Sequence, residues 1–193
     1  MSSSQHIAAV DPRIQRTRQL LQRSLEKLLA EKEFDAISVH DITEKATVNR
    51  ATFYDHYPDK FSLLQCLVAT RFRELLEKHD IRFKGCEGAI RAIATGVCTY
   101  LNEMPSGCSA QNRQSGQLLE TAIVGVVREM MLQGLKSHRP KKSASLEVLA
   151  SAAAWAIYGA AKEWMLTPNR VSVDRIAKTI DAMVSPMLAT AMA

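Results

Sequence analysis

The segment from Thr47 to Lys60, TVNRATFYDHYPDK, constrains the fold of this chain most strongly. Asn49 is suited to cap the first turn of a helix, because its side-chain oxygen can accept a hydrogen bond from a free backbone amide. Pro58 predicts the end of that helix, since proline moves the residue before it out of helical geometry. The sequence therefore predicts a helix of about two turns over Arg50–Tyr57, followed at once by another helix that Asp59 caps.

A second short helix is expected directly upstream. Ser38-Val-His-Asp41 has the Ser-x-x-acid form of a capping box, which opens a helix that runs to Ala46 or Thr47. Two such helices joined by a tight turn make a helix-turn-helix. The second helix of such a unit lies in the major groove of DNA. The two segments together thus predict a DNA-binding unit.

With these residues in view, the chain resembles the TetR family of transcriptional regulators. The family pattern is approximately Ala-Gly-Val-Ser-Arg-Gly-Thr-(aromatic or Leu)-Tyr-x-His-Phe-x-x-Lys, and residues 46–60 stand as Ala-Thr-Val-Asn-Arg-Ala-Thr-Phe-Tyr-Asp-His-Tyr-Pro-Asp-Lys. Thr47, Asn49 and Ala51 depart from it, replacing a glycine, a serine and a glycine. Asn49 keeps the capping function. Thr47 is less comfortable in a left-handed turn, because β-branched residues disfavour positive φ.

Helical periodicity throughout the chain, with no stretch of strand period, predicts an all-α protein. With the resemblance, this implies an N-terminal three-helix helix-turn-helix domain and a C-terminal helical bundle for ligand binding and dimerisation. We divide the chain into a flexible N-terminal arm (1–10), a DNA-binding domain (11–58) and a ligand-binding and dimerisation domain (59–193), with helix 59–79 as the connector. The core of the DNA-binding domain is expected to contain six apolar side chains: Phe34, Ile37, Val39, Ile42, Phe53 and Tyr57.

Nine residues are candidate DNA contacts: His40, Asn49, Arg50, Ala51, Thr52, Tyr54, Asp55, His56 and Lys60. Arg50 has the fork geometry for guanine O6 and N7, with a phosphate contact or a plain surface charge as the alternative. Ala51 can meet a thymine methyl group, and Thr52 either a phosphate or a thymine methyl group. Asp55 can accept a hydrogen bond from cytosine N4 or point aside.

The resemblance places three further candidates, His40, Tyr54 and His56, at positions that contact the phosphate backbone, although His40 is equally compatible with a merely exposed histidine. Lys60 adds a positive charge beside a helix N-terminus, and both suit a phosphate. Residues 1–60 contain nine Lys/Arg and nine Asp/Glu, so we expect DNA binding with a modest dependence on salt.

The second half of the chain predicts four helices, at 89–104, 118–135, 146–166 and 172–191, with a loop at 105–115. The stretch 146–166 is apolar nearly all round, so it must be buried on several sides. The resemblance implies that 146–166 and 172–191 form a homodimer. Two copies of a short groove helix double the base contacts and require a near-palindromic double-stranded DNA site.

The resemblance also implies an unknown small-molecule effector that binds within the bundle. Ten residues are candidates for lining its site: Cys98, Leu101, Met104, Leu119, Ile123, Val127, Met130, Trp155, Tyr158 and Trp164. Each is explained as well by ordinary core packing. An alternative is a thiol-reactive regulator on the same fold that uses Cys108 or Cys86, for which an inert cysteine is the competing interpretation.

Other classes of protein find little support in the sequence. No apolar run approaches the roughly 20 residues of a membrane span, and the N-terminus lacks the features of a signal peptide, so we expect a cytoplasmic protein without a membrane partner. GxSxG, Walker and GxGxxG motifs are absent, as is a paired His/carboxylate set, so we expect no enzyme, cofactor or metal. The resulting hypothesis is a dimeric regulator, most often a repressor in this family, that a small molecule releases from DNA.

Overall fold

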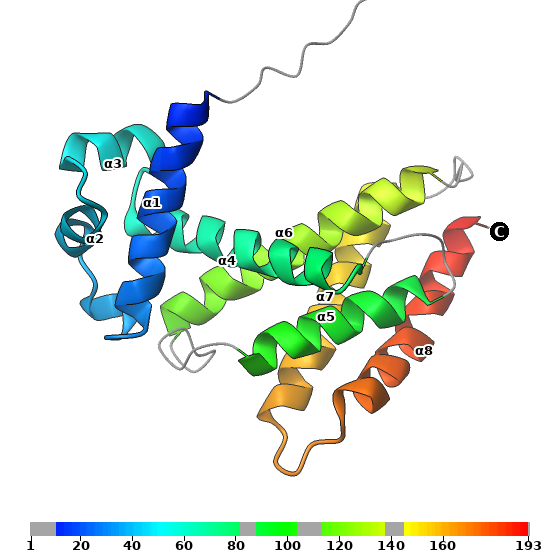
Figure 1. Cartoon of the computed structure of the whole chain (residues 1–193). Coiled ribbons are helices and arrows are strands. Elements are labelled where there is room, and N and C mark those ends of the chain that lie inside the picture. Colours follow the sequence, from blue (N-terminus) through cyan, green and yellow to red (C-terminus); the bar gives the residue numbers. More distant parts are fainter. Residues whose placement is uncertain (1–10, 82–87, 104–112, 138–144, 193) are drawn as a thin grey trace, which may run out of the picture. The chain divides into compact units, whose positions relative to one another are not determined.

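The computed structural model describes residues 11–81, 88–103, 113–137 and 145–192, and within them every regular element is helical (Figure 1). The elements are α1 (Pro12–Leu29), the 3₁₀ helix η1 (Phe34–Ala36), α2 (Val39–Ala46), α3 (Arg50–His56), α4 (Lys60–Lys78), α5 (Ala89–Glu103), α6 (Arg113–Ser137), α7 (Leu146–Leu166) and α8 (Val173–Met192). This confirms the predicted all-α class.

The chain divides into two compact units between Leu64 and Gln65, inside α4. The boundary expected from the sequence, between residues 58 and 59, lies just before this helix begins at Lys60. The proposed N-terminal arm, residues 1–10, lies outside the described residues.

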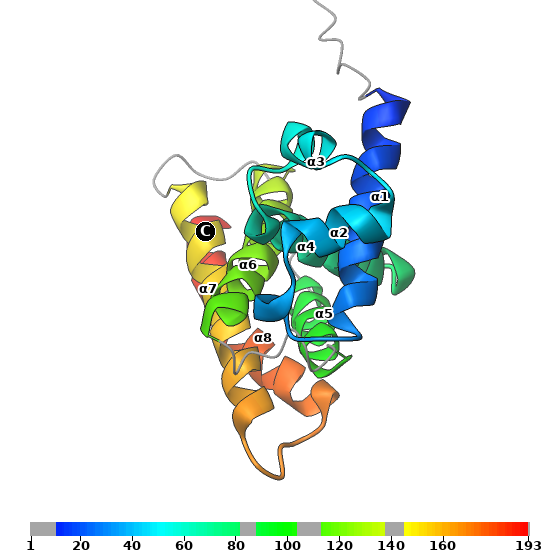
Figure 2. The same ribbon diagram turned by 90° about the vertical axis from the view of Figure 1, so that its left-hand side faces the viewer.

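In the first unit, α1 packs against α2 and α3, and Figure 2 shows α2 crossing α1. Asp11 caps α1, since its Oδ1 accepts a hydrogen bond from the Arg13 amide at 2.9 Å, and Pro12 occupies the first helical position. Five of the six predicted core side chains are buried, whereas Val39 is only half-buried. Val39 is the first residue of α2, where the helix emerges toward solvent.

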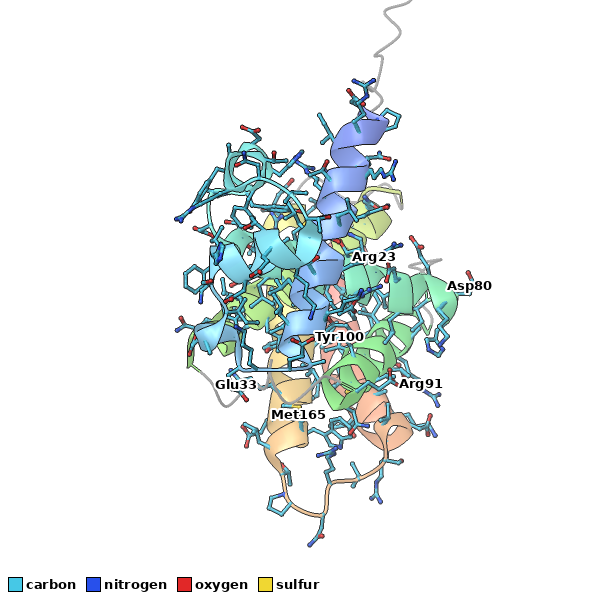
Figure 3. All side chains as sticks on the ribbon, turned by 60° about the vertical axis from the view of Figure 1, so that its left-hand side comes forward. Arg23, Glu33, Asp80, Arg91, Tyr100 and Met165 are labelled. Carbon is cyan, nitrogen blue, oxygen red and sulfur yellow. The ribbon has the colours of Figure 1, made fainter. Side chains whose placement is uncertain are left out.

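In the second unit, α7 contacts α5, α6 and α8, and α5 also packs against α8. This agrees with the expected burial of α7 on several sides, which its many alanines permit. Arg91 of α5, labelled in Figure 3, forms an ion pair with Asp174 of α8 at 2.5 Å. Tyr100, also labelled there, lies with its ring centroid 5.3 Å from that of Phe72 and so ties α5 to α4.

One helix begins earlier than expected: residues 113–115 belong to α6, although we assigned them to a loop. Their polar side chains suggested a loop, but arginine and glutamine are good helix formers. The rest of the loop assigned to 105–115 lies outside the described residues. Within the described residues, no helix has the length and apolar character needed to cross a membrane.

Candidate nucleic-acid interface

The turn between α2 and α3 depends on a left-handed residue. The capping box at the start of α2 is present as predicted: Ser38 Oγ accepts from the Asp41 amide at 3.1 Å, and Asp41 Oδ2 accepts from the Ser38 amide at 2.7 Å. At the other end, Thr47 has φ 53° and ψ 42°, and its amide donates to the Glu44 carbonyl. The conformation that the sequence identified as unfavourable for threonine is the one that Thr47 adopts.

α3 is fixed to the first unit by Phe53 and by Tyr57, the residue that directly follows the helix. Phe53 and Tyr57 are buried, with ring centroids 6.1 Å apart, and Gln22 Nε2 lies 3.3 Å from the Tyr57 hydroxyl. Asn49 caps the helix as expected, since its Oδ1 accepts from the Ala51 amide at 2.9 Å. One side of α3 is therefore held in the core and the other side is presented to solvent.

The exposed side of α3 carries Arg50, Ala51, Tyr54 and Asp55. Arg50 Nη2 donates to the Tyr54 hydroxyl at 3.2 Å, and the guanidinium carbon lies 5.6 Å from the centroid of the Tyr54 ring. This contact between residues one turn apart directs the arginine along the helix surface. The side chain thus has its guanidinium oriented beside an exposed hydroxyl.

The remaining candidate contacts differ in accessibility. Asn49 is exposed, while Thr52 and His56 are half-buried. His40 is exposed on α2, and its Nε2 lies 3.9 Å from a carboxylate oxygen of Glu44. Both α2 and α3, and the turn between them, therefore expose candidate side chains within the first unit.

Lys60 has a different environment from the one that the sequence suggested. Its ammonium donates to the carbonyl oxygens of Phe34, Asp35 and Ile37 at 3.2, 3.2 and 2.7 Å. It also lies 4.7 Å from the centroid of the Phe34 ring. A lysine ammonium has three donors, and here all three have partners within the protein. The side chain thus fastens η1 to the start of α4, and this arrangement leaves no donor for the expected phosphate contact.

Two ion pairs that sequence reasoning missed hold α2 in place. Lys32 Nζ lies 3.0 Å from Asp41 Oδ2, and Lys45 Nζ lies 2.5 Å from Glu31 Oε1. The amide and hydroxyl of Ser38, together with Lys32, hold the pKa of the Asp41 carboxyl well below its ordinary value. The capping box signalled the role of Asp41, but no local pattern indicates either lysine, because their partners lie in other elements.

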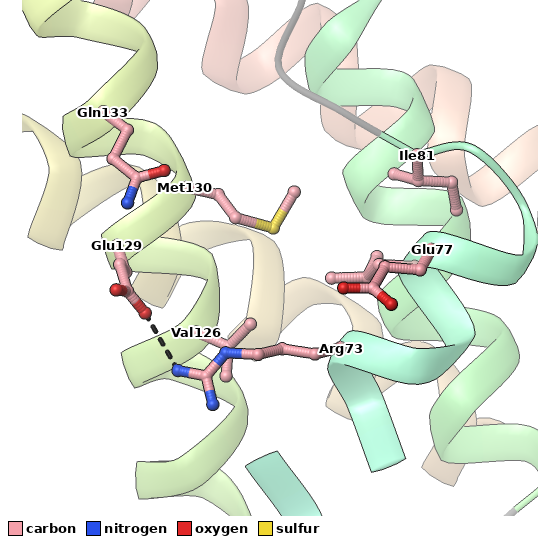
Figure 4. A pocket seen from close by; sticks show the side chains of 8 residues that line it. Arg73, Glu77, Ile81, Val126, Glu129, Met130 and Gln133 are labelled. Atoms are coloured by element: carbon pink, nitrogen blue, oxygen red, sulfur yellow. Dashed lines mark hydrogen bonds and ion pairs between the residues drawn. The ribbon is translucent and has the colours of Figure 1, made fainter. Parts of the chain in front are cut away.

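Nine of the ten candidate effector residues lie within the described residues, and they differ in burial. Seven of them are buried in the second unit: Cys98, Leu101, Leu119, Ile123, Val127, Tyr158 and Trp164. Trp155 is 50% exposed, so its side chain faces away from the core of this chain. Met104 lies outside the described residues. The tenth, Met130, is half-buried and lines a cavity of about 230 Å³ between α4 and α6 (Figure 4).

Of the two described cysteines, Cys98 is buried and Cys66 is half-buried. Burial raises the pKa of the Cys98 thiol to about 12, which keeps it protonated near neutral pH. The two sensing candidates, Cys86 and Cys108, lie outside the described residues. Among the described histidines, cysteines and carboxylates, no group of three has an arrangement suited to a metal ion.

Comparison with known proteins agrees with this geometry. Residues 24–67, which span the α2-turn-α3 segment, match the sequence model of the bacterial regulatory proteins of the tetR family. The chain therefore carries a TetR-family DNA-binding domain over residues 24–67. The family consists of DNA-binding transcriptional regulators and not of enzymes. The HTH-type transcriptional regulator YxbF of Bacillus subtilis (strain 168) is 42% identical over 96 residues, which make up 49% of this chain and 25% of YxbF. This chain thus matches only a quarter of that relative's length.

Solved structures share the fold of this chain. A TetR-family regulator from Streptomyces coelicolor has a TM-score of 0.62 at 16% identity, covering 94% of this chain and 99% of its own. RolR in complex with resorcinol has a TM-score of 0.57 at 20% identity, covering 93% and 94%. FadR from Bacillus subtilis in complex with stearoyl-CoA has a TM-score of 0.51 at 12% identity, covering 86% and 97%. At these identities the similarity concerns the fold.

Proposed function

We propose that this chain is a transcriptional regulator that binds double-stranded DNA through α3 and leaves it when a small molecule binds the second unit. The observation that supports this proposal is that α3 is buried on one side and exposed to solvent on the other. Phe53 and Tyr57 anchor one side, and the other side exposes Arg50, Ala51 and Tyr54. A short, rigidly anchored helix with an exposed arginine is what direct base readout in a major groove requires.

Within this proposal, the exposed residues of α3 have separate tasks. Arg50 donates to guanine O6 and N7, and its contact with the Tyr54 hydroxyl limits the conformations that the arginine must lose on binding. Ala51 and Thr52 face thymine methyl groups or a phosphate. Tyr54, together with His40 and His56, contacts the phosphate backbone and fixes the register, while Asp55 accepts from a cytosine N4 or points aside.

The proposed DNA-binding form is a homodimer built from α7 and α8. Although α7 is central in its own unit, it exposes three large apolar side chains, Val148 at 66%, Trp155 at 50% and Leu166 at 52%. Met183 on α8 is 54% exposed. Exposed large apolar side chains on adjacent helices favour association, because their burial removes apolar surface from water. Trp155 then serves the dimer and not an effector cavity.

Regulation by a small molecule is the second part of the proposal, with repression as its sign. RolR and FadR were solved in complex with resorcinol and stearoyl-CoA, respectively. In this chain the second unit contains cavities of about 230 and 290 Å³. α4 begins in the first unit and continues into the second, so it is the candidate element for transmission. An effector shifts the DNA-binding equilibrium only by its differential affinity for the two states.

The proposal is tested by fluorescence anisotropy on DNA from upstream of the protein's own gene, with unrelated DNA as competitor. The wild type is compared with a Thr52→Ala/Tyr54→Ala variant. Lys78→Ala is the control, because it removes a positive charge from the exposed last turn of α4. We expect competitor-resistant binding by the wild type and Lys78→Ala, and its loss in the double variant. Equal binding by all three proteins contradicts the assignment of α3.

A further inference from the structure

We propose that the cavity between α4 and α6 binds a small organic cation with an apolar body, and that this cation competes with Arg73 for Glu129. The inference rests on the proposed function, because it names the effector class and the place where the effector acts. The cavity, called the α4–α6 groove below, has a volume of about 230 Å³ and lies within the second unit. Eight residues line it: Arg73, Leu76, Glu77, Ile81, Val126, Glu129, Met130 and Gln133.

The floor of the α4–α6 groove is apolar. Leu76 and Val126 are buried beneath it, and the Met130 side chain extends from α6 into the groove (Figure 4). Ile81, just beyond α4, lines the side opposite α6. Methionine is flexible and polarisable, so it adapts to an aromatic or aliphatic ligand. These side chains suit a ligand whose body is apolar.

The charged rim of the groove favours a cation. Two carboxylates, Glu77 and Glu129, face one guanidinium, that of Arg73. Arg73 Nη2 forms an ion pair with Glu129 Oε2 at 2.9 Å, which leaves Glu77 without an ion-pair partner among the described residues. A cationic ligand in this groove approaches a carboxylate on each side, whereas an anionic ligand meets two like charges. The remaining polar residue, Gln133, can donate or accept.

The ion pair across the groove links ligand binding to the contact between α4 and α6. Arg73 belongs to α4 and Glu129 to α6, so the pair connects the helix that enters the first unit to the bundle. A ligand cation at Glu129 and the Arg73 guanidinium compete for the same carboxylate. Binding therefore favours the state in which α4 has lost this contact. Because both side chains are about half exposed, the pair is weak enough for a small molecule to displace.

The test uses the full chain with ¹³C-labelled methionine methyl groups and benzyltrimethylammonium as the probe. Met130→Leu assigns the Met130 signal, and benzoate is the anionic counterpart. We expect the cation, and not benzoate, to shift the Met130 signal in a saturable way. Glu77→Gln and Glu129→Gln should each weaken binding about fivefold, as for an exposed ion pair. Arg73→Gln should strengthen binding by about the same factor, because it removes the competitor for Glu129. Glu103→Gln, an exposed change at the end of α5, should have no effect.

The inference is supported if Arg73→Gln raises the affinity for the cation and Glu129→Gln lowers it. Two substitutions that merely disrupted the groove would both lower this affinity. The inference is overturned if both variants weaken binding, if benzoate shifts Met130 as the cation does, or if the cation leaves Met130 unchanged at millimolar concentration. Anisotropy on operator DNA separates this result from the proposed function. If the protein binds operator DNA specifically but the cation does not shift the Met130 signal, the proposed function stands and the cation site is excluded. If the cation shifts the Met130 signal but the protein does not bind operator DNA specifically, the cation site stands and the proposed DNA-binding function is excluded.

Discussion

Replacing Lys60 by methionine should destabilise the first unit strongly, although the side chain is only half-buried. Methionine keeps the apolar stem beside the Phe34 ring and has a similar helix propensity, so the change removes little besides the ammonium. The ammonium donates to three carbonyls, and their local environments determine the cost. Asp35 is exposed, so water can replace the ammonium there, and the Phe34 carbonyl still accepts from the Ile37 amide at 3.0 Å.

The Ile37 carbonyl carries most of the expected cost. It accepts from Lys60 at 2.7 Å, and Ile37 is buried, with no other donor to its carbonyl among the described residues. A buried acceptor left without a partner costs about 1–3 kcal/mol, so we expect a loss of about 2 kcal/mol. For a unit of this size that corresponds to a decrease of roughly 10 °C in Tm.

Calorimetry on the full chain measures this loss. Both tryptophans, Trp155 and Trp164, lie in the second unit, so tryptophan fluorescence should show an unchanged transition and serves as an internal control. Lys45→Met is the matched variant, because it removes an ammonium from a surface ion pair, for which we expect less than about 1 kcal/mol. The reasoning is refuted if Lys60→Met is as stable as the wild type while the salt slope of DNA binding falls by about one. That result would restore Lys60 as a phosphate contact.

Three further predictions concern the turn, the capping box and the dimer. Thr47→Gly should raise the stability of the first unit by about 0.5–1 kcal/mol, because relief of the left-handed conformation exceeds the entropy cost of glycine; a lower stability in urea unfolding would contradict this. Asp41 has a lowered pKa, so its stabilising contribution is present above its ordinary pKa of 3.8 and is lost as the pH falls toward the folded-state value. In Asp41→Asn the free energy of unfolding should therefore fall less steeply with decreasing pH below 3.8 than in the wild type. An equally steep fall would exclude Asp41 as a source of the acid sensitivity. Trp155→Glu should produce monomers in sedimentation velocity, whereas Glu103→Gln should not; an unchanged dimer would place the interface elsewhere.

The features that the sequence predicted well are those with local causes. Asn49 and the Ser38–Asp41 box cap helices through neighbouring amides, so residue type and spacing suffice to place them. The bounds of α7, Leu146–Leu166, were predicted because these residues form a stretch that is apolar nearly all round. The left-handed turn at Thr47 was recognisable because the residue is unusual for its position.

The features that the sequence did not predict depend on partners far along the chain. Lys60 donates to the carbonyls of Phe34, Asp35 and Ile37, and backbone carbonyls leave no signature in a sequence. The ion pair of Arg73 with Glu129 depends on how α4 packs against α6, which periodicity does not determine. Trp155 illustrates a third limit. Its apolar character predicts burial, but not whether its own chain or a partner covers it.

The central claim, that α3 reads bases, is tested most directly by one ratio. Anisotropy gives the affinities of the wild type and of Arg50→Ala for operator DNA and for unrelated DNA at the same salt concentration. A bidentate contact to guanine is worth about 1–3 kcal/mol, so Arg50→Ala should lower the ratio of specific to non-specific affinity about tenfold or more. A ratio that is unchanged, with both affinities reduced alike, would show that Arg50 contacts only phosphate and would contradict base recognition by this arginine.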